Sequence, residues 1–271
     1  MKIKSLFVGA IVIAFGLANV RATVLLSDNF DSYANQAAFQ AAWPITVGAG
    51  GTLSTAQAVS APNSISFGTL AARNDRSFTE SGNPSPANAI TFSLDFFDSN
   101  AGVSPYRQVS QLIDGLGNAS GMLVSLGLNN NQSSTDGGGN YYMARILGYT
   151  VTTSPDPNGG PADSGTLGAG AFFKLNDYGV GLRTTGWHNL KVTITDTAFD
   201  FYVDGALAET VANAFTLRSY DLVRLGSGIS SLQPTFFDNI NVEVNPVPEP
   251  GTLTFIALGL GVLVAVRQFR K

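Results

Sequence analysis

Apolar and polar residues alternate along much of the chain between positions 23 and 246. In Ala89–Phe96 every second residue is large and apolar, as in a strand that buries one face (Ile90, Phe92, Leu94 and Phe96). Further apolar stretches between turn-forming residues also predict strands, at 122–128, 141–151, 171–175, 178–182 and 222–226.

The clearest pattern lies between Gly186 and Val211. His188, Leu190, Val192 and Ile194 alternate with polar residues and are expected on one face of a strand. A second strand follows with Phe199, Phe201 and Val203 on one face, and a third is expected over 206–211. Asp204-Gly205 between them favours a two-residue type I′ turn, which requires positive φ angles. The segment therefore predicts a three-stranded antiparallel meander.

The remaining elements fit the same class of fold. A final strand is expected over Thr235–Val244, with a bulge or turn near Asp238-Asn239, and one short helix over Asn35–Trp43. Short strands without intervening helices indicate an all-β protein, an antiparallel β-sandwich of the jelly-roll kind.

The first 22 residues have the features of a secretory signal peptide. Lys2 and Lys4 form a basic start, Leu6–Leu17 is apolar, and Val20-Arg21-Ala22 offers small residues before a cleavage point. Cleavage by signal peptidase after Ala22 would make Thr23 the new N-terminus, and cleavage after Ala18 is the alternative. The protein is therefore expected to be exported.

The C-terminal segment has three consecutive parts. Pro248 and Pro250 precede an uncharged run at 251–266, which as a helix would span about 24 Å, somewhat less than the roughly 30 Å hydrocarbon core of a bilayer. Arg267, Arg270 and Lys271 follow directly, and such cationic flanks favour the cytoplasmic side. The order predicts a transmembrane helix at 251–266 with a basic tail at 267–271.

Val247-Pro248-Glu249-Pro250-Gly251, the apolar run and the basic tail together resemble the PEP-CTERM sorting signal of bacteria with two membranes. The resemblance implies a protein held transiently in the inner membrane and cut near the prolines by an exosortase. It also implies association with exopolysaccharide and the cell envelope or extracellular matrix. The expected division is a signal peptide at 1–22, a sandwich domain at 23–246 and a sorting signal at 247–271.

The meander sequence "GWHNLKVTITDTAFDFYVDGALAET" resembles the concanavalin A-like, laminin-G-like jelly roll. In that fold a Trp opens one strand, and a hairpin with the pattern Phe-x-Val-Asp-Gly follows. The resemblance implies the fold and leaves the function open, because lectins, glycosidases and adhesive modules share it.

Charge and composition narrow the function classes. Of 15 Lys and Arg residues six lie in the two terminal segments, and of 19 acids only Glu249 does. The remaining 9 basic and 18 acidic residues give the domain a net charge of −9, so no nucleic-acid partner is expected. The chain has no Cys and one His, which excludes disulfides, thiolate sites and multi-His zinc sites.

Catalysis is not expected. Glycoside hydrolysis needs two carboxyl groups across the scissile bond, and Glu80, Glu209 and Glu243 lie far apart in sequence. His188 is the sole histidine, and no Gly-x-Ser-x-Gly motif accompanies it, so a structural role is the more natural interpretation. A glycosidase would require an unusual pair of Asp residues.

Two binding sites are candidates. Calcium prefers oxygen ligands, and pairing of the first and last strands would bring Asp28 and Asp31 near Asp238 and Asn239. Glycan binding is the second, because two Gly- and Asn-rich loops at 129–140 and 154–170 lie beside aromatic residues (Tyr141, Tyr142 and Tyr149). The expected function is a non-enzymatic structural or adhesive protein of the envelope, and the alternative is a lectin-like module that recognises a glycan through these loops.

Overall fold

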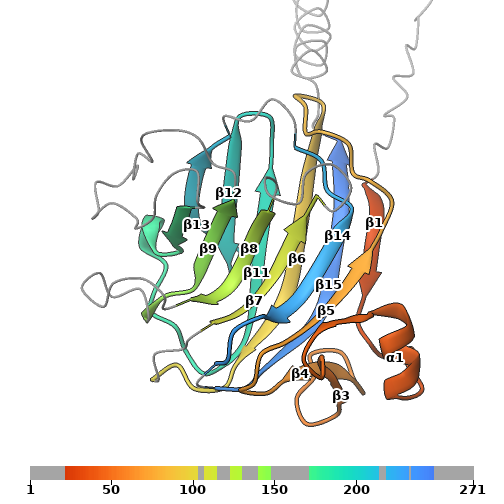
Figure 1. Ribbon diagram of the computed structural model, residues 1–271. Coiled ribbons are helices and arrows are strands. Elements are labelled where there is room, and N and C mark those ends of the chain that lie inside the picture. The colour runs from red at the N-terminus through yellow and green to blue at the C-terminus, as the bar shows by residue number, and fades with distance from the viewer. Residues whose placement is uncertain are drawn as a thin grey trace, which may run out of the picture.

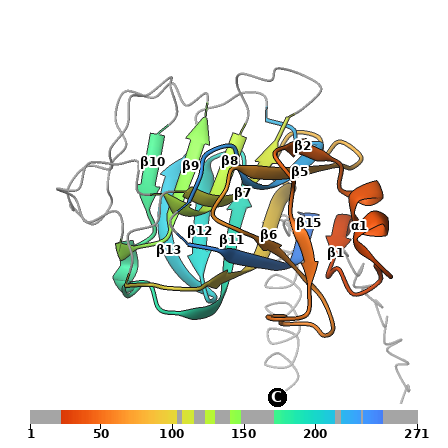
Figure 2. The same ribbon diagram turned by 60° about the horizontal axis from the view of Figure 1, so that its bottom comes forward.

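The computed structural model describes residues 22–102, 107–114, 123–129, 140–147, 171–213, 218–231 and 233–246. These residues form two antiparallel sheets stacked face to face, as Figures 1 and 2 show. The predicted all-β antiparallel sandwich is therefore confirmed. The predicted terminal helices, at 1–22 and 251–266, lie outside the described residues, except for Ala22. Within the described part of the chain, no helix is long and apolar enough to cross a membrane.

The first sheet has eight strands in the order β13-β12-β11-β6-β15-β4-β3, and β1 also pairs with β15. Its strands are β1 (Thr23–Asp28), β3 (Thr52–Ser54), β4 (Ser64–Phe67), β6 (Asn88–Asp98), β11 (Gly186–Ile194), β12 (Ala198–Val203), β13 (Ala206–Ala212) and β15 (Thr235–Pro246).

The second sheet has seven strands in the order β10-β9-β8-β7-β14-β5-β2. It lies in front in Figure 1 and uppermost in Figure 2. Its strands are β2 (Ile45–Val47), β5 (Ala72–Ser77), β7 (Arg107–Ile113), β8 (Leu123–Asn129), β9 (Met143–Leu147), β10 (Ala171–Lys174) and β14 (Leu222–Ser227).

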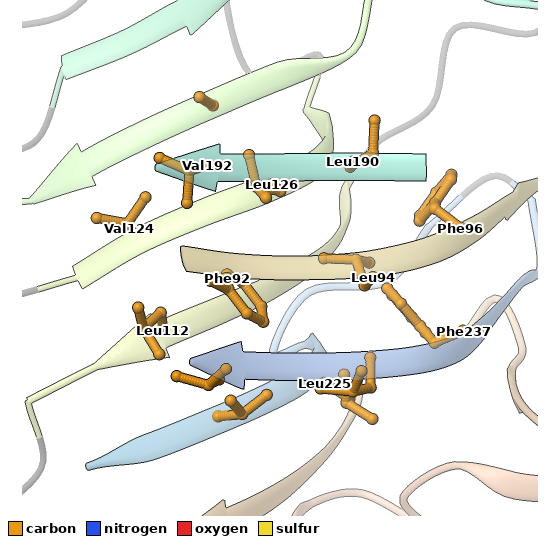
Figure 3. Packing of buried hydrophobic residues seen from close by; sticks show 14 of the residues in the cluster. Phe92, Leu94, Phe96, Leu112, Val124, Leu126, Leu190, Val192, Leu225 and Phe237 are labelled. Atoms are coloured by element: carbon orange, nitrogen blue, oxygen red, sulfur yellow. The ribbon is translucent and has the colours of Figure 1, made fainter. Parts of the chain in front are cut away.

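The core lies between the two sheets. Alternate residues of β6 and β11 point inward and meet those of β7, β8 and β14 from the other sheet, as Figure 3 shows. Three phenylalanine rings connect neighbouring strands of the first sheet. Phe237 of β15 meets Phe96 of β6 and Phe67 of β4 edge to face, with ring centroids 5.4 and 5.5 Å apart. Burial of this apolar surface is the main force that holds the layers together.

The alternation patterns predicted the central strands correctly. Ile90, Phe92, Leu94 and Phe96 of β6 are all buried, and β11, β12 and β13 form the expected meander. Its turn has φ angles of 50° at Asp204 and 81° at Gly205, which a type I′ turn requires.

The predicted irregularities near the two ends of the domain are also present. The pairing of β15 with β6 shifts register between Asp238 and Asn241, and Asn239 has a φ of 48°, which confirms the bulge. The short helix α1 spans Gln36–Ala42, and Asn35 caps it by accepting a hydrogen bond from the Ala38 amide.

One strand prediction was wrong. Residues 178–182 do not form a strand, because the 3-10 turn η3 (Asp177–Gly179) occupies the start of this segment. Tyr178 and Gly179 have φ angles of 54° and 82°, and two successive left-handed residues turn the chain away from an extended path. The apolar residues Val180 and Leu182 therefore line an opening beside β11 rather than one face of a strand.

Candidate functional site

A pocket of about 300 Å³ lies at one end of the sandwich, between η3 and the β12–β13 hairpin. Tyr142 comes from the residue before β9, His188 from the start of β11, and Asp204 from the hairpin turn. The full lining comprises Tyr142, Gly179, Val180, Gly181, Leu182, Thr184, His188, Val203, Asp204 and Ala206. Leu182 is 62% exposed, so the rim offers apolar surface to a ligand.

Hydrogen bonds hold the His188 ring on both sides. Its Nδ1 lies 2.8 Å from the Asp204 carboxylate, and its Nε2 lies 2.9 Å from the Thr184 carbonyl oxygen and 3.1 Å from the Thr184 hydroxyl. The other Asp204 oxygen accepts from the Asn189 amide at 2.8 Å. The hairpin turn is thereby fastened to the start of β11.

These partners decide what His188 can do. A carboxylate and a carbonyl oxygen only accept hydrogen bonds, so both bonds form together only when both ring nitrogens carry a proton. A histidine that acts as a base on a hydroxyl needs a lone pair on the nitrogen facing that hydroxyl. Nε2 lies near both the carbonyl oxygen and the hydroxyl of Thr184, so it donates to the former or accepts from the latter according to its tautomer, and either arrangement anchors the ring between Thr184 and Asp204.

Tyr142 forms the inner wall of the pocket. It is 4% exposed, and its ring lies edge-on to Phe96 and tilted against His188, with centroid separations of 6.1 and 5.2 Å. Its hydroxyl lies 3.4 Å from both an Asp98 carboxylate oxygen and the Thr184 carbonyl. Burial, reinforced by the Asp98 charge, raises the pKa of Tyr142, so the phenol stays neutral and donates hydrogen bonds.

Beneath Tyr142 lies an ion pair whose two side chains have no exposed surface. The Arg183 Nε and Nη2 atoms donate to the two Asp98 oxygens at 2.8 and 3.1 Å. The Gln233 amide donates to the same carboxylate at 2.9 Å. Such a buried pair fixes the chain around Arg183 in one position, and with it the adjacent wall of the pocket.

The three predicted glycan-binding tyrosines do not form one surface. Tyr142 lies in the pocket, Tyr141 is half-buried, and Tyr149 lies outside the described residues, as do nearly all positions of the two long loops. Sequence reasoning missed Leu182, Thr184 and Asp204 as pocket residues. A hint was available in Gly179-Val180-Gly181-Leu182, where apolar residues follow glycines just before His188.

The strand pairing expected for the calcium site is present, since β1 runs beside β15 and Asp28 faces Ile240. The Asp28 carboxylate, however, accepts hydrogen bonds from Tyr33, from the Trp43 indole at 2.9 Å and from the Phe30 amide at 2.8 Å, and forms an ion pair with Arg76. Its charge is already balanced within the fold, so it serves to join β1 to β5 and α1.

The other three predicted ligands also have structural roles. Asp238 accepts from the amides of Val59 and Ser60 at 2.8 and 3.0 Å, and burial raises its pKa while these hydrogen bonds oppose the rise. Asp31 accepts from the Asn63 amide at 2.9 Å, and the Asn239 side chain donates to Asp95 at 2.7 Å. In the described ranges no group of three or more His, Cys, Asp or Glu residues could hold a metal ion. The predicted calcium site thus gains no support from these contacts.

The predicted sorting residues lie outside the described residues, and comparison with known proteins addresses them. Residues 246–271 match the family profile described as the PEP-CTERM protein-sorting motif. The chain therefore carries this motif at its C-terminus and is an exported protein, processed by an exosortase and sorted to the cell surface. No curated protein matches the sequence.

Solved structures resemble the described fold at low sequence identity. A conserved carbohydrate esterase from the Shiga toxin-encoding bacteriophage phi24B has 12% identity and a TM-score of 0.51 over 83% of this chain and 100% of its own. The cellulose-induced protein Cip1 has 15% identity and a TM-score of 0.48 over 80% of this chain and 96% of its own. The laminarinase catalytic domain of Thermotoga maritima MSB8 has 12% identity and a TM-score of 0.48 over 82% of this chain and 98% of its own. The likeness concerns the fold, a two-sheet sandwich of the concanavalin A-like kind.

Proposed function

We propose that this protein is a non-enzymatic component of the exopolysaccharide-rich cell envelope or extracellular matrix, with a structural or adhesive role. The observation that carries the proposal is the sorting motif at 246–271, which starts at the last residue of β15. The sandwich is thus cargo delivered to the surface, released there once the exosortase has cut the chain.

The chemistry of the described polar groups supports a role without catalysis. The His188 ring is held between the Asp204 carboxylate and Thr184. Asp98 is paired with Arg183, and Asp238 is surrounded by amide donors. Each of these groups has its partners within the fold, which supports a structural role for it.

Fractionation of the native host, with mass spectrometry of the mature termini, tests this proposal. The expected protein begins at Thr23, or at Asn19 if cleavage follows Ala18, ends near Pro248–Pro250 and is found in the surface or matrix fraction. A protein recovered with Arg267–Lys271 intact, or confined to the cytosol, would overturn it.

A second candidate function, recognition of a neutral glycan, is favoured by the pocket beside Tyr142. Apolar surface from Leu182 next to the polar groups of Thr184 and Asp204 is the combination that sugar rings require. Because Leu182 is 62% exposed, Leu182→Ala should leave the fold intact and weaken glycan retention on an array by about 5-fold, the loss of roughly 1 kcal/mol of apolar contact. The matched control is Leu70→Ala, at a leucine that is 78% exposed and outside the pocket lining. Equal retention by the wild-type and Leu182→Ala proteins would refute this second function.

A further inference from the structure

A row of aromatic side chains crosses the outer face of the eight-stranded sheet. Strand register places Trp187 of β11 opposite Phe97 of β6, and Phe97 opposite Phe236 of β15. Directly paired residues in antiparallel strands project on the same side. We call Trp187, Phe97 and Phe236 the aromatic row. It extends over three adjacent strands, about 10 Å at the usual inter-strand distance.

The aromatic row projects away from the core. Phe96 and Phe237, the neighbours of Phe97 and Phe236 along their strands, belong to the buried cluster between the sheets, and successive residues of a strand alternate sides. All three residues of the row are half-buried, so each keeps surface that a ligand can contact. This face is turned away from the viewer in Figure 1, where the seven-stranded sheet lies in front.

Contacts within the row hold its rings in place. Trp187 and Phe236 each meet Phe97 edge to face, with ring centroids 5.3 and 5.7 Å apart and interplanar angles of 66° and 86°. The face of an aromatic ring carries partial negative charge and attracts the weakly positive C–H groups of a sugar ring. The row is therefore a preformed apolar strip, and such preorganised groups lose little side-chain freedom when a ligand binds.

A hydrogen-bonded polar group lies directly beside the row. Asp95, two residues before Phe97 and on the same face, accepts from the side-chain amides of Asn189 and Asn239 at 2.8 and 2.7 Å. These three polar residues are half-buried. Carboxylate and amide oxygens accept hydrogen bonds from hydroxyl groups. An apolar strip flanked by fixed polar groups is suited to a ligand that is apolar on one face and carries hydroxyl groups at its edges, as a sugar ring is.

Charge argues against two other occupants of this face. The half-buried charged residues in the eight strands are Asp95, Asp200, Glu243 and Lys191. This excess of acids repels an acidic polymer. It also disfavours a second copy of the chain placed face to face, because like charges would then meet across the interface. A neutral polymer has no such cost, and its hydroxyl groups can donate to the carboxylates.

The row lies at the end of the sheet opposite to the sorting motif. Phe236 is the second residue of β15, and Pro246, where the motif begins, is the last. The extended strand between them is about 33 Å long at the usual rise per residue. A domain tethered through its C-terminal segment therefore carries the row at the end of β15 away from the tether.

We propose that the aromatic row binds a neutral polysaccharide with an extended chain, whose sugar rings pack on Trp187 and Phe236 and whose hydroxyl groups bond to Asp95. An extended chain is favoured because the three aromatic residues lie in a line across adjacent strands. This inference rests on the proposed function, since it names the polymer class with which the exported protein would associate. The surface is separate from the pocket, whose lining includes none of the three aromatic residues.

The two tryptophans of the chain provide the test. Trp43 has no exposed surface and Trp187 is half-buried, so a polymer on the row shields Trp187 alone. Quenching of tryptophan fluorescence by acrylamide is measured for the mature exported protein with glucomannan and with hydroxyethylcellulose, two neutral polymers with extended chains. Dextran is the coiled neutral control and alginate the acidic one. We expect at least one of the extended neutral polymers to protect Trp187, and neither control to do so.

Variants in affinity electrophoresis assign the binding to the row. Trp187→Leu and Phe236→Leu should each weaken polymer binding about 10-fold, the usual effect of losing one aromatic contact. Trp187→Tyr keeps a ring and should lie between Trp187→Leu and wild type. The matched control is Tyr202→Leu, because Tyr202 is a half-buried aromatic residue of the same face whose ring is covered by the Lys191 ammonium, 4.1 Å from its centroid. This control should bind as the wild type does, and thermal melting verifies that every variant is folded.

Several outcomes would overturn the inference: no binding to either extended neutral polymer, equal binding to dextran or alginate, undiminished binding by folded Phe236→Leu, or a dimer in sedimentation that Phe236→Leu dissociates. The last outcome would assign the row to contact between copies of the chain. These failures are distinct from failure of the proposed function. A matrix-located protein that binds no neutral polymer refutes only the role of the aromatic row, whereas a cytosolic protein refutes the proposed function whatever it binds in vitro.

Discussion

The buried Arg183–Asp98 ion pair provides the sharpest test of how this domain is held together. Both side chains have no exposed surface, and the two Arg183 nitrogens lie 2.8 and 3.1 Å from the carboxylate oxygens. Replacing Arg183 by Met keeps a long apolar side chain but leaves the Asp98 charge buried, with the Gln233 amide at 2.9 Å as its main remaining donor. Breaking a buried pair in this way costs about 3–5 kcal/mol of unfolding free energy.

For a domain of this size the loss corresponds to a thermal midpoint lower by about 6–20 °C. Urea denaturation followed by fluorescence of the two tryptophans measures it directly, and the dependence on urea should keep its slope. Removal of both charges, in Asp98→Leu with Arg183→Met, should destabilise less than Arg183→Met alone, because no unpaired charge then remains.

The control is Lys191→Met, a half-buried cation on the other side of β11 that lies 4.1 Å from the Tyr202 ring centroid. It should cost less than about 1 kcal/mol, the usual value of an accessible cation–π contact. A loss of under about 1 kcal/mol for Arg183→Met, or a double variant less stable than the single one, would refute the assignment of the pair as a buried structural element.

Three further predictions concern other parts of the fold. Burial raises the pKa of Tyr220 to about 12, whereas a tyrosine in the unfolded chain has a pKa of about 10. The stabilisation of the fold by the neutral phenol is therefore complete below pH 10 and is lost as the pH rises toward 12. The free energy of unfolding should fall by about 1.4 kcal/mol more between pH 8 and 11 in wild type than in Tyr220→Phe, and equal falls in urea titrations would contradict this. Gly127→Ala should cost about 2 kcal/mol or more, since φ is 141° and a Cβ would lie 2.3 Å from the Gln108 carbonyl oxygen; Gly68→Ala, with nothing within 4 Å, is the control that should unfold as wild type does. Asn35→Ala removes the cap of α1 and should cost about 1 kcal/mol in the same assay, and an unchanged midpoint would show that the cap contributes nothing.

The strands that could be predicted are those whose burial is one-sided. In β6 and β11 one face packs on the core and the other carries polar residues, so the period of two is visible in the sequence. The meander also has a hairpin turn with an unmistakable residue pair, Asp204-Gly205. Local chemistry and the final fold agree at these positions, which is why sequence reasoning identified them.

The strand β5 could not be predicted, because its inward face is itself polar. Asn74 there accepts from the Gly51 amide and donates to the Trp43 carbonyl oxygen, both at 2.6 Å, and Arg76 reaches Asp28 in β1. These partners are 23 to 48 residues away in the chain. The extended state of "ARNDRS" is therefore imposed by its neighbours β14 and β2 rather than by its own pattern.

The pocket and the distribution of charge between the sheets were hidden for a related reason. The pocket depends on η3, whose left-handed Tyr178 follows no common turn signature. The distribution of charge depends on strand pairing, since Arg73 and Arg224 come to adjacent strands only when β5 pairs with β14 across 151 positions. A net charge summed over the chain conceals such separation, and only the strand order reveals that one sheet holds most of the basic residues.

The position of the sorting motif relative to the seven-stranded sheet has a mechanical consequence. Thr23 pairs with Val244, so the start of β1 and the end of β15 leave the eight-stranded sheet at the same end, and the motif begins at Pro246, the last residue of β15. No strand of the seven-stranded sheet pairs with β1 or β15 within the described residues. Cutting the chain after β15 therefore leaves the strand register of the seven-stranded sheet unchanged.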